Sequence, residues 1–133
     1  MELHTPFETQ GLLAMKVLIV EREELVAEVL ANALAESGIE SATVRGDREA
    51  ISACELDVPQ LVITSINRQP EDMQGLQLVR AMRKRRPLLR AIYLAALWPA
   101  RLHQYALDFH ERFLPKPVPM TRFVQTVREL LPA

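Results

Sequence analysis

The polar side chains best placed to do chemistry come at the ends of apolar segments of the chain. Ser65 lies near the end of residues 61–66, whose β-branched members indicate a strand buried on both faces of a parallel sheet. Glu21 comes directly after the apolar segment 16–20, and Lys116 follows a third, shorter one. Because the carboxyl ends of parallel strands meet at one edge of an open sheet, we expect these three side chains to line one pocket.

A serine, a lysine and a carboxylate in one pocket allow two kinds of chemistry. Serine acts as a nucleophile where a neighbouring base takes its proton, and no histidine is expected beside Ser65. The hydroxyl and the Lys116 ammonium could instead bind a small anion, or Ser65 could accept phosphate as an ester. We therefore do not expect an enzyme, and anion binding stays an open alternative.

Strands and helices are expected to alternate along the chain. Short β-branched apolar segments predict strands, and apolar residues at helical spacing predict helices between them. The predicted strands span 16–20, 39–44, 61–66, 91–95 and 113–115. The predicted helices span 25–37, 48–56 with Asp47 as its N-cap, 76–86 and 120–131, and one more carries Leu102, Tyr105, Ala106 and Phe109 on one face.

Five such strand–helix units predict a doubly wound α/β fold. Parallel strands require crossover connections, which are almost always right-handed, so helices cover both faces of a five-stranded parallel sheet. The length of 133 residues fits one domain. We place this domain at residues 15–133 and expect residues 1–14, which show no periodic pattern, to form an N-terminal extension.

Composition and charge exclude several classes of protein. A net charge of −1 gives no overall attraction to nucleic acid or to a membrane. The longest apolar run is far shorter than the roughly 20 residues that span a bilayer. Cys54 is the single cysteine, so we expect a reducing, cytoplasmic location and a small buried hydrophobe at this position. The three histidines lack the spacing of metal ligands, and no metal or other cofactor is expected.

These features together resemble the receiver domain of two-component response regulators. The matching stretches are Lys-Val-Leu-Ile-Val at 16–20, a helix ending at Gly38, Pro-Gln-Leu-Val-Ile at 59–63, Gly-Leu at 75–76 and Phe-Leu-Pro-Lys-Pro at 113–117. The resemblance runs from residue 15 to residue 131. It implies a flavodoxin-like sheet with strand order 2-1-3-4-5.

The resemblance also implies the family's phosphoryl-transfer site, in which a histidine kinase phosphorylates an aspartate at the end of the third strand. Mapped residue by residue, the phosphoacceptor falls on Ser65 and the acid pair on Glu21 and Arg22. Asn67 falls where the family supplies a backbone carbonyl to the metal. Serine and arginine at two acidic positions remove two negative charges and add a positive one, which opposes binding of Mg²⁺.

The other positions of the family's site are partly kept. The lysine falls on Lys116, which we expect to form an ion pair with Glu21 or a hydrogen bond with Ser65. The switch positions fall on Ala95, which cannot hydrogen-bond a phosphoryl oxygen, and on Phe113. The chain therefore resembles a degenerate pseudo-receiver, which is not phosphorylated and acts as a signalling protein–protein interaction module.

Two surfaces are candidates for contact with partners. In the family, the face made by the fourth helix, fifth strand and fifth helix forms homodimers and output contacts, so we expect a protein partner or self-association there. The basic run from Arg83 to Arg86 could bind a polyanion, but a solvated helix end, where cations suit the helix dipole, is the favoured interpretation. Neither nucleic acid nor a membrane is an expected partner.

Overall fold

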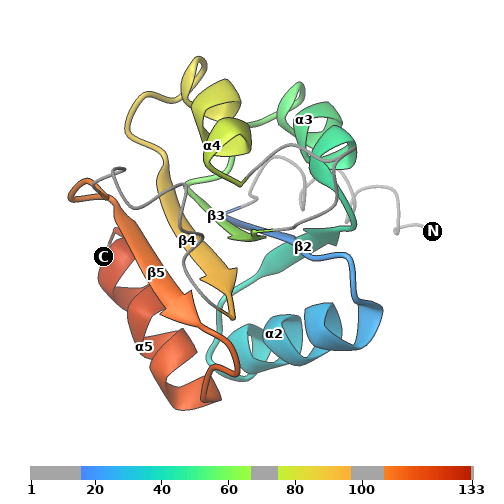
Figure 1. The fold of residues 1–133 in the computed structure, drawn as a ribbon, viewed down its shortest axis with the longest axis vertical. Helices are drawn as coiled ribbons and strands as arrows, with labels where there is room; N and C mark the ends of the chain where they lie inside the picture. The colour runs from blue at the N-terminus through green and yellow to red at the C-terminus, as the bar shows by residue number, and fades with distance from the viewer. Residues whose placement is uncertain (1–15, 67–74, 97–106, 133) are drawn as a thin grey trace.

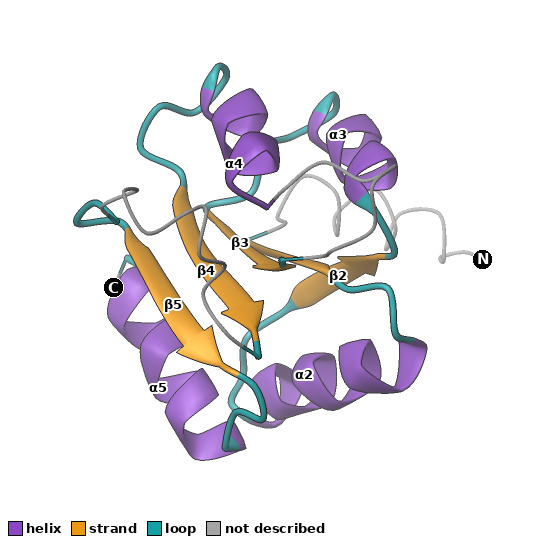
Figure 2. Cartoon of the chain, in the orientation of Figure 1, coloured by secondary structure: helices purple, strands orange, loops and turns teal. Residues whose placement is uncertain are grey.

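The described chain folds into a five-stranded parallel sheet with helices on both faces (Figures 1 and 2). The computed structural model describes residues 16–66, 75–96 and 107–132. The strand order is β2-β1-β3-β4-β5, which confirms the predicted doubly wound α/β fold. In chain order the elements are β1 (Val17–Val20), α2 (Glu24–Glu36), β2 (Ser41–Val44), α3 (Asp47–Cys54), β3 (Leu61–Ser65), α4 (Gly75–Arg83), β4 (Arg90–Ala95), β5 (Glu111–Pro115) and α5 (Met120–Leu130).

The carboxyl ends of the strands line up at one edge of the sheet. β1 pairs with β3, with Val20 beside Thr64, and the last residues of β4 and β5 lie beside each other. This register brings Glu21, which follows β1, and Lys116, which follows β5, to the edge that carries Ser65. The sheet therefore gathers the three side chains that the sequence singles out.

Each face of the sheet has its own apolar core, with α3 and α4 on one side and α2 and α5 on the other (Figure 2). The first core contains Leu18 and Tyr93 from the strands, and the second contains Ile63 from β3 and Phe123 from α5. Residues Leu61 to Thr64 of β3 are all buried, which confirms that this strand is covered on both faces. The core thus fixes the strand ends on which the candidate site is built.

Helix boundaries differ from the predicted ones by a few residues, as helix ends commonly do. Asp47 is the first residue of α3 and not its N-cap, because Gly46 takes the extended cap conformation. Asp47 and Glu49 then lie in the first turn, where the helix dipole favours acids. The helix α4 ends at Arg83, so the rest of the basic run belongs to the turn that follows.

The prediction that Phe109 belongs to a helix is wrong. Residues 109 and 110 form a turn, and β5 begins at Glu111, earlier than predicted. The turn is favoured because Asp108 Oδ1 accepts the His110 backbone N–H at 2.8 Å, and Glu111 Oε1 accepts the Asp108 backbone N–H at 2.9 Å. The remaining parts of that prediction, Leu102, Tyr105 and Ala106, lie outside the described residues, as does the predicted extension 1–14.

The helices of the described chain are short. The longest, α2, has 13 residues. Among the described residues, no helix has the length and apolar character needed to cross a bilayer.

Candidate functional site

The candidate site is centred on the carboxylate of Glu21 at the carboxyl edge of the sheet. Glu21 follows β1 directly, and its backbone N–H donates to the carbonyl of Val44 at 3.0 Å. Its side chain is only 4% exposed. Backbone pairing with β2 therefore holds Glu21 at the end of β1, and its carboxylate is buried.

Two side chains from other strands donate to the same oxygen of Glu21. The Ser65 hydroxyl at the end of β3 donates to Glu21 Oε1 at 2.5 Å, the short distance of a charge-assisted bond. Lys116 Nζ, just after β5, donates to the same oxygen at 3.3 Å. The predicted ion pair between Lys116 and Glu21 is therefore confirmed, and Ser65 shares its acceptor.

The second oxygen of this carboxylate is also occupied. The backbone N–H of Glu23 donates to Glu21 Oε2 at 3.1 Å. Glu23 is the N-cap residue of α2, next to the N–H groups that have no acceptor within the helix. Glu21 thus accepts a hydroxyl, an ammonium and a backbone amide, and one negative charge faces one positive charge in this cluster.

Comparison with protein-family models matches residues 17–128 to the response regulator receiver domain. The chain belongs to this family. A search of curated proteins found no match.

Solved structures share the fold of this receiver domain. A response regulator receiver protein from Sinorhizobium medicae superposes with a TM-score of 0.76 and 19% identity, covering 87% of this chain and 93% of that one. The Vibrio cholerae chemotaxis protein CheY4 superposes with a TM-score of 0.75 and 21% identity, covering 88% of this chain and 98% of that one. The receiver domain of a histidine kinase from Syntrophus aciditrophicus superposes with a TM-score of 0.74 and 29% identity, covering 88% of this chain and 89% of that one.

The family implies a divalent metal beside the phosphoacceptor, and the residues at this edge do not fit one. Magnesium prefers several oxygen ligands, with carboxylates to balance its charge. Within the described part of the chain, no group of three or more His, Cys, Asp or Glu side chains could hold a metal. The oxygens of Glu21 already accept three donors, and the cationic Arg22 follows it in the chain. Asn67, which maps where the family supplies a backbone carbonyl to the metal, lies outside the described residues.

The two residues mapped onto the family's switch positions are apolar and packed. Ala95 is buried at the end of β4, and its carbonyl accepts the Lys116 backbone N–H at 2.9 Å. Alanine offers no hydroxyl to a phosphoryl group at this position. Phe113 is half-buried and packs against the core under α3 and α4. Ala95 therefore contacts the site through its backbone bond to Lys116, and Phe113 contributes to the apolar core.

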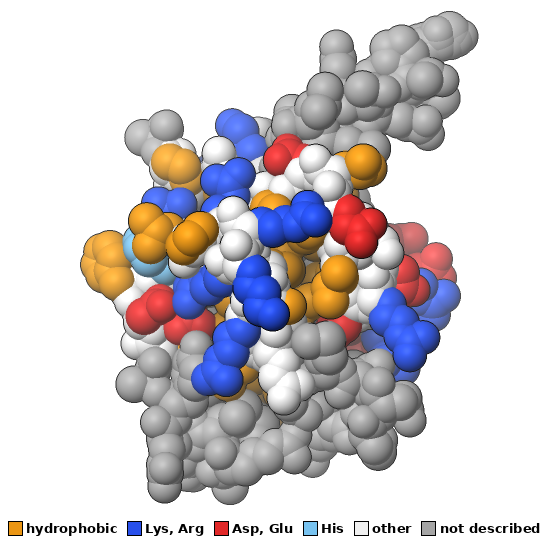
Figure 3. Space-filling view, turned by 90° about the horizontal axis from the view of Figure 1, so that it is seen from above, with side chains coloured by type: hydrophobic (Ala, Val, Ile, Leu, Met, Phe, Trp, Pro, Cys, Tyr) orange, Lys and Arg blue, Asp and Glu red, His pale blue; other side chains and the backbone are white. Residues whose placement is uncertain are grey.

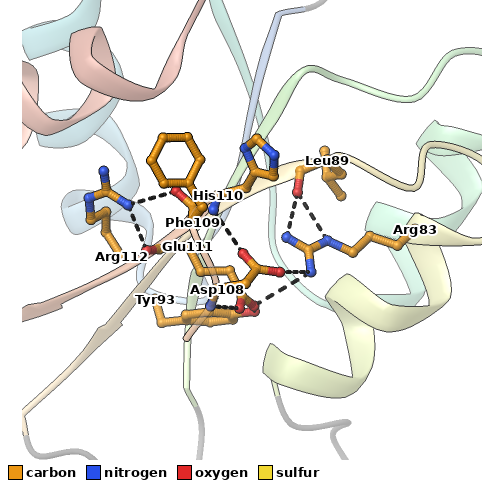
Figure 4. A network of polar contacts seen from close by, with 8 residues as sticks. All are labelled: Arg83, Leu89, Tyr93, Asp108, Phe109, His110, Glu111 and Arg112. Carbon is orange, nitrogen blue, oxygen red and sulfur yellow. Dashed lines mark hydrogen bonds and ion pairs between the residues drawn. The ribbon is translucent and has the colours of Figure 1, made fainter. Parts of the chain in front are cut away.

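A second polar cluster lies at the opposite, amino edge of the sheet, and sequence reasoning missed it (Figure 4). Its centre is the carboxylate of Glu111, the first residue of β5, which is 2% exposed. The Tyr93 hydroxyl of β4 donates to Glu111 Oε2, and the Asp108 backbone N–H donates to Oε1 at 2.9 Å. Arg83 at the end of α4 reaches Glu111 at 4.0 Å and Asp108 at 2.9 Å.

A signal for this cluster was present in the sequence. Glu111 pairs with Ala91 across the β4–β5 ladder, so Tyr93, two residues further along β4, lies diagonally from it on the same face. A carboxylate entering a buried strand needs a donor, and a tyrosine in the neighbouring strand can supply one. This pairing was not deduced because the predicted strand began at Phe113, which left Glu111 in a loop.

The charges of this cluster shift two pKa values. Burial acts to lower the pKa of Arg83, but the hydrogen bond to Asp108 and the charges of Asp108 and Glu111 outweigh it, so the pKa is raised. Burial acts to raise the pKa of Asp108, but hydrogen bonds from Arg83 and from the His110 backbone N–H, with the charges of both residues, lower it. The ion pair between Arg83 and Asp108 therefore persists to a lower pH than the ordinary pKa of an aspartate would allow.

Lys84, Arg85 and Arg86 of the basic run are exposed just after the end of α4, as the prediction of a solvated helix end requires, and the arginines also contact backbone carbonyls. Arg83 Nε and Nη2 donate to the carbonyl of Leu89 at 3.0 and 2.7 Å. Arg85 donates to the carbonyls of Cys54 and Glu55, both at 3.1 Å, at the end of α3. Arg86 donates to the carbonyl of Val58 at 3.1 Å. These bonds join α4 to α3 and to the edge of the sheet.

Cys54 is a buried residue of α3, as predicted. Burial raises the pKa of its thiol to about 11, and the charge of Arg85 offsets this only in part. A thiol with this pKa is protonated at neutral pH, which makes it a poor nucleophile.

Proposed function

We propose that this receiver domain is a signalling module that works without phosphorylation and acts by binding a protein partner. The observation that carries the proposal is the saturated carboxylate of Glu21, which accepts the Ser65 hydroxyl, the Lys116 ammonium and the Glu23 N–H. Each group that would handle a metal or a phosphoryl group is already engaged with another. The cluster ties β1, β3 and β5 together and holds the edge in one arrangement.

The chemistry of Ser65 supports this proposal. A carboxylate attacks phosphorus directly, whereas a hydroxyl must lose its proton to a base as it attacks. The hydroxyl of Ser65 points its proton at Glu21, a carboxylate that also neutralises Lys116. A phosphate ester on Ser65 would place at least one further negative charge against a buried carboxylate, which is electrostatically unfavourable.

The same geometry weighs against the two alternatives. A small anion at Ser65 and Lys116 would have to displace the Glu21 carboxylate, which is 4% exposed, from both donors. A polyanion at the basic run would compete with the carbonyls that Arg83, Arg85 and Arg86 already contact. Binding of a protein partner needs none of these bonds to break.

The test of the proposal is exposure of the purified protein to acetyl phosphate and Mg²⁺, with intact-mass readout. We expect no labile phosphoryl adduct on the wild-type chain. The Arg22→Asp/Ser65→Asp double variant, which restores two acids, is the positive control for the donor and the conditions. A labile adduct on the wild-type chain contradicts the proposal. A rise in melting temperature with inorganic phosphate would favour the anion-binding alternative instead.

The surface on which the partner binds is a separate question. The face predicted from the family includes residues 97–106, which lie outside the described residues, together with β5 and α5. Contact through that face stays a proposal.

A further inference from the structure

Two large apolar side chains are exposed at the amino edge of β4 and β5. Phe109 is 82% exposed and Leu88 is 64% exposed. Each precedes its strand by two residues, Leu88 before Arg90 and Phe109 before Glu111, and the two strands are paired. Figure 3 shows hydrophobic side chains gathered beside the pale blue histidine on this face. We call Leu88 and Phe109 the edge patch.

Several hydrogen bonds connect the turn that carries Phe109 to the polar cluster of Glu111 (Figure 4). Asp108 accepts the His110 N–H at 2.8 Å and an Arg83 N–H at 2.9 Å. Arg112 Nη1 donates to the carbonyl of Phe109 at 3.0 Å. The rings of Phe109 and His110 meet edge to face, with centroids 5.4 Å apart. Because these bonds already order the backbone of the turn, binding of a partner to the Phe109 ring costs less conformational entropy there, as at the anchor residues of interfaces.

Basic side chains lie next to the edge patch in the sequence, and the exposed acid beside Phe109, Asp108, is already paired with Arg83 at 2.9 Å. Lys84 and Arg86 are exposed in the turn before Leu88, and the half-buried Arg112 follows Phe109. Figure 3 shows Lys and Arg side chains spread across this face, next to the hydrophobic ones. The patch therefore fits an apolar surface that carries acids.

The complementary surface lies on α2 of the same chain. Leu25 is 76% exposed and Val29 is 52% exposed, and their i, i+4 spacing puts them on one side of the helix. Glu24 and Glu28, both exposed, flank them. In Figure 1, α2 lies at the bottom of the molecule, and the start of β5 lies at the upper left. We call Leu25 and Val29, with these two acids, the α2 patch.

We propose that the edge patch of one molecule binds the α2 patch of a second copy of this chain. The two surfaces match in their apolar centres and are opposite in the charge of their rims, and a net charge of −1 gives little repulsion between copies. Because the patches lie on different elements, the contact is heterologous, and each pair leaves one patch of each kind open for a further copy. The inference rests on the proposed function, because it names the partner of that interaction module.

The test is sedimentation velocity over about micromolar to about millimolar protein, a range that detects weak association. The wild-type chain is expected to gain average mass with concentration. Phe109→Ser and Leu25→Ser each remove one kind of patch from every molecule, so each variant alone should associate about tenfold more weakly or not at all. Both side chains are exposed, and thermal unfolding checks that the two variants fold.

Mixing the two variants distinguishes this contact from any symmetric one. Phe109→Ser retains the α2 patch and Leu25→Ser retains the edge patch, so an equimolar mixture should form dimers, and growth should stop there. Glu28→Lys should weaken wild-type association, whereas Glu40→Lys, an equal change of charge at an exposed residue outside both patches, should not. Association should also weaken with salt.

Three results would overturn the inference: a wild-type chain that is monomeric throughout, a single variant that associates like wild type, or a mixture that stays monomeric. Failure here leaves the proposed function standing, because acetyl phosphate and Mg²⁺ test that function without reference to oligomeric state. A phosphoryl adduct on a chain that still associates would contradict the proposed function and leave the contact between the two patches standing.

Discussion

In the described part of the chain, a buried carboxylate lies at each edge of the sheet, and each is contacted by a hydroxyl, a cation and a backbone N–H. Glu21 at the carboxyl edge accepts a hydroxyl, an ammonium and a backbone N–H. Glu111 at the amino edge accepts a hydroxyl and a backbone N–H and has a guanidinium 4.0 Å away. The family's phosphoacceptor, acid pair and lysine map onto Ser65, Glu21, Arg22 and Lys116 and not onto Glu111, so we interpret the contacts of Glu111 as structural. A similar set of contacts at Glu21 supports the proposal that this carboxylate has a structural role.

The difference between the two lies in their cations and their access to water. Lys116 has a side chain that is 32% exposed, and it forms an ion pair with Glu21. Arg83 is 17% exposed and is shared between Glu111 and Asp108. Breaking a buried pair leaves an uncompensated charge, and solvent reduces that cost where it reaches the pair. The Glu111 cluster should therefore contribute more to stability than the Glu21 cluster.

The largest expected effect is that of Glu111→Ala. This change leaves the Tyr93 hydroxyl and the Asp108 N–H without their acceptor and removes a buried negative charge near Arg83, so it should cost about 3–5 kcal/mol of unfolding free energy. Urea unfolding followed by circular dichroism measures the loss. Glu129→Ala, at an exposed acid on α5, is the control and should stay within about 0.5 kcal/mol of wild type. A cost below about 1 kcal/mol for Glu111→Ala would contradict the comparison.

A smaller effect is expected at the carboxyl edge. Ser65→Ala should lower the free energy of unfolding by about 1–3 kcal/mol, because Glu21 Oε1 loses a charge-assisted hydrogen bond. Lys116→Met should lower it by less than the loss of a buried ion pair would, because the Lys116 ammonium is partly solvated. Since both donors share one oxygen, the double variant should be non-additive, with a coupling of about 0.5 kcal/mol or more. The same urea titrations supply this cycle. Strict additivity would mean that the two donors act independently of Glu21.

The smallest expected effect concerns how the free energy of unfolding falls at low pH. The pKa of Asp108 is lowered by its contacts with Arg83 and His110, so the unfolded chain binds a proton there at a higher pH than the folded chain does. The stability that this carboxylate contributes is present above its ordinary pKa of 3.8 and is lost as pH falls through the lowered value. Asp108→Asn should therefore flatten the loss of stability below about pH 4, measured by urea midpoints across pH. An unchanged slope would contradict the pKa assignment.

The sequence predicts the fold and the Glu21 cluster because both follow from periodicity. Alternating apolar strands and helices specify a parallel sheet, and a parallel sheet brings Glu21, Ser65 and Lys116 to one edge whatever their side chains do there. The bond between Ser65 and Glu21 could not be predicted, because it depends on the side-chain rotamers at that edge. The ion pair between Lys116 and Glu21 needed only opposite charges at neighbouring strand ends.

The Glu111 cluster could not be predicted in the same way because local bonds decide it. The apolar spacing that ends at Phe109 favours a helix, but the side chains of Asp108 and Glu111 bind the backbone N–H groups of this segment and stabilise a turn. The carbonyl contacts of the basic run could not be predicted for a related reason. Its arginines appear as a charge cluster in the sequence, whereas in three dimensions Arg85 lies against the carbonyls at the end of α3.

The central claim is that Glu21 is a structural carboxylate and not a metal ligand. A titration of the wild-type domain with Mg²⁺, followed by the backbone amide NMR signals of Glu21, Ser65 and Lys116, tests it most directly, with Arg22→Asp/Ser65→Asp as the positive control. The account predicts no saturable shift of these signals at about millimolar Mg²⁺ in the wild type. Saturable shifts of the three signals, with a dissociation constant of about a millimolar or tighter, would contradict it.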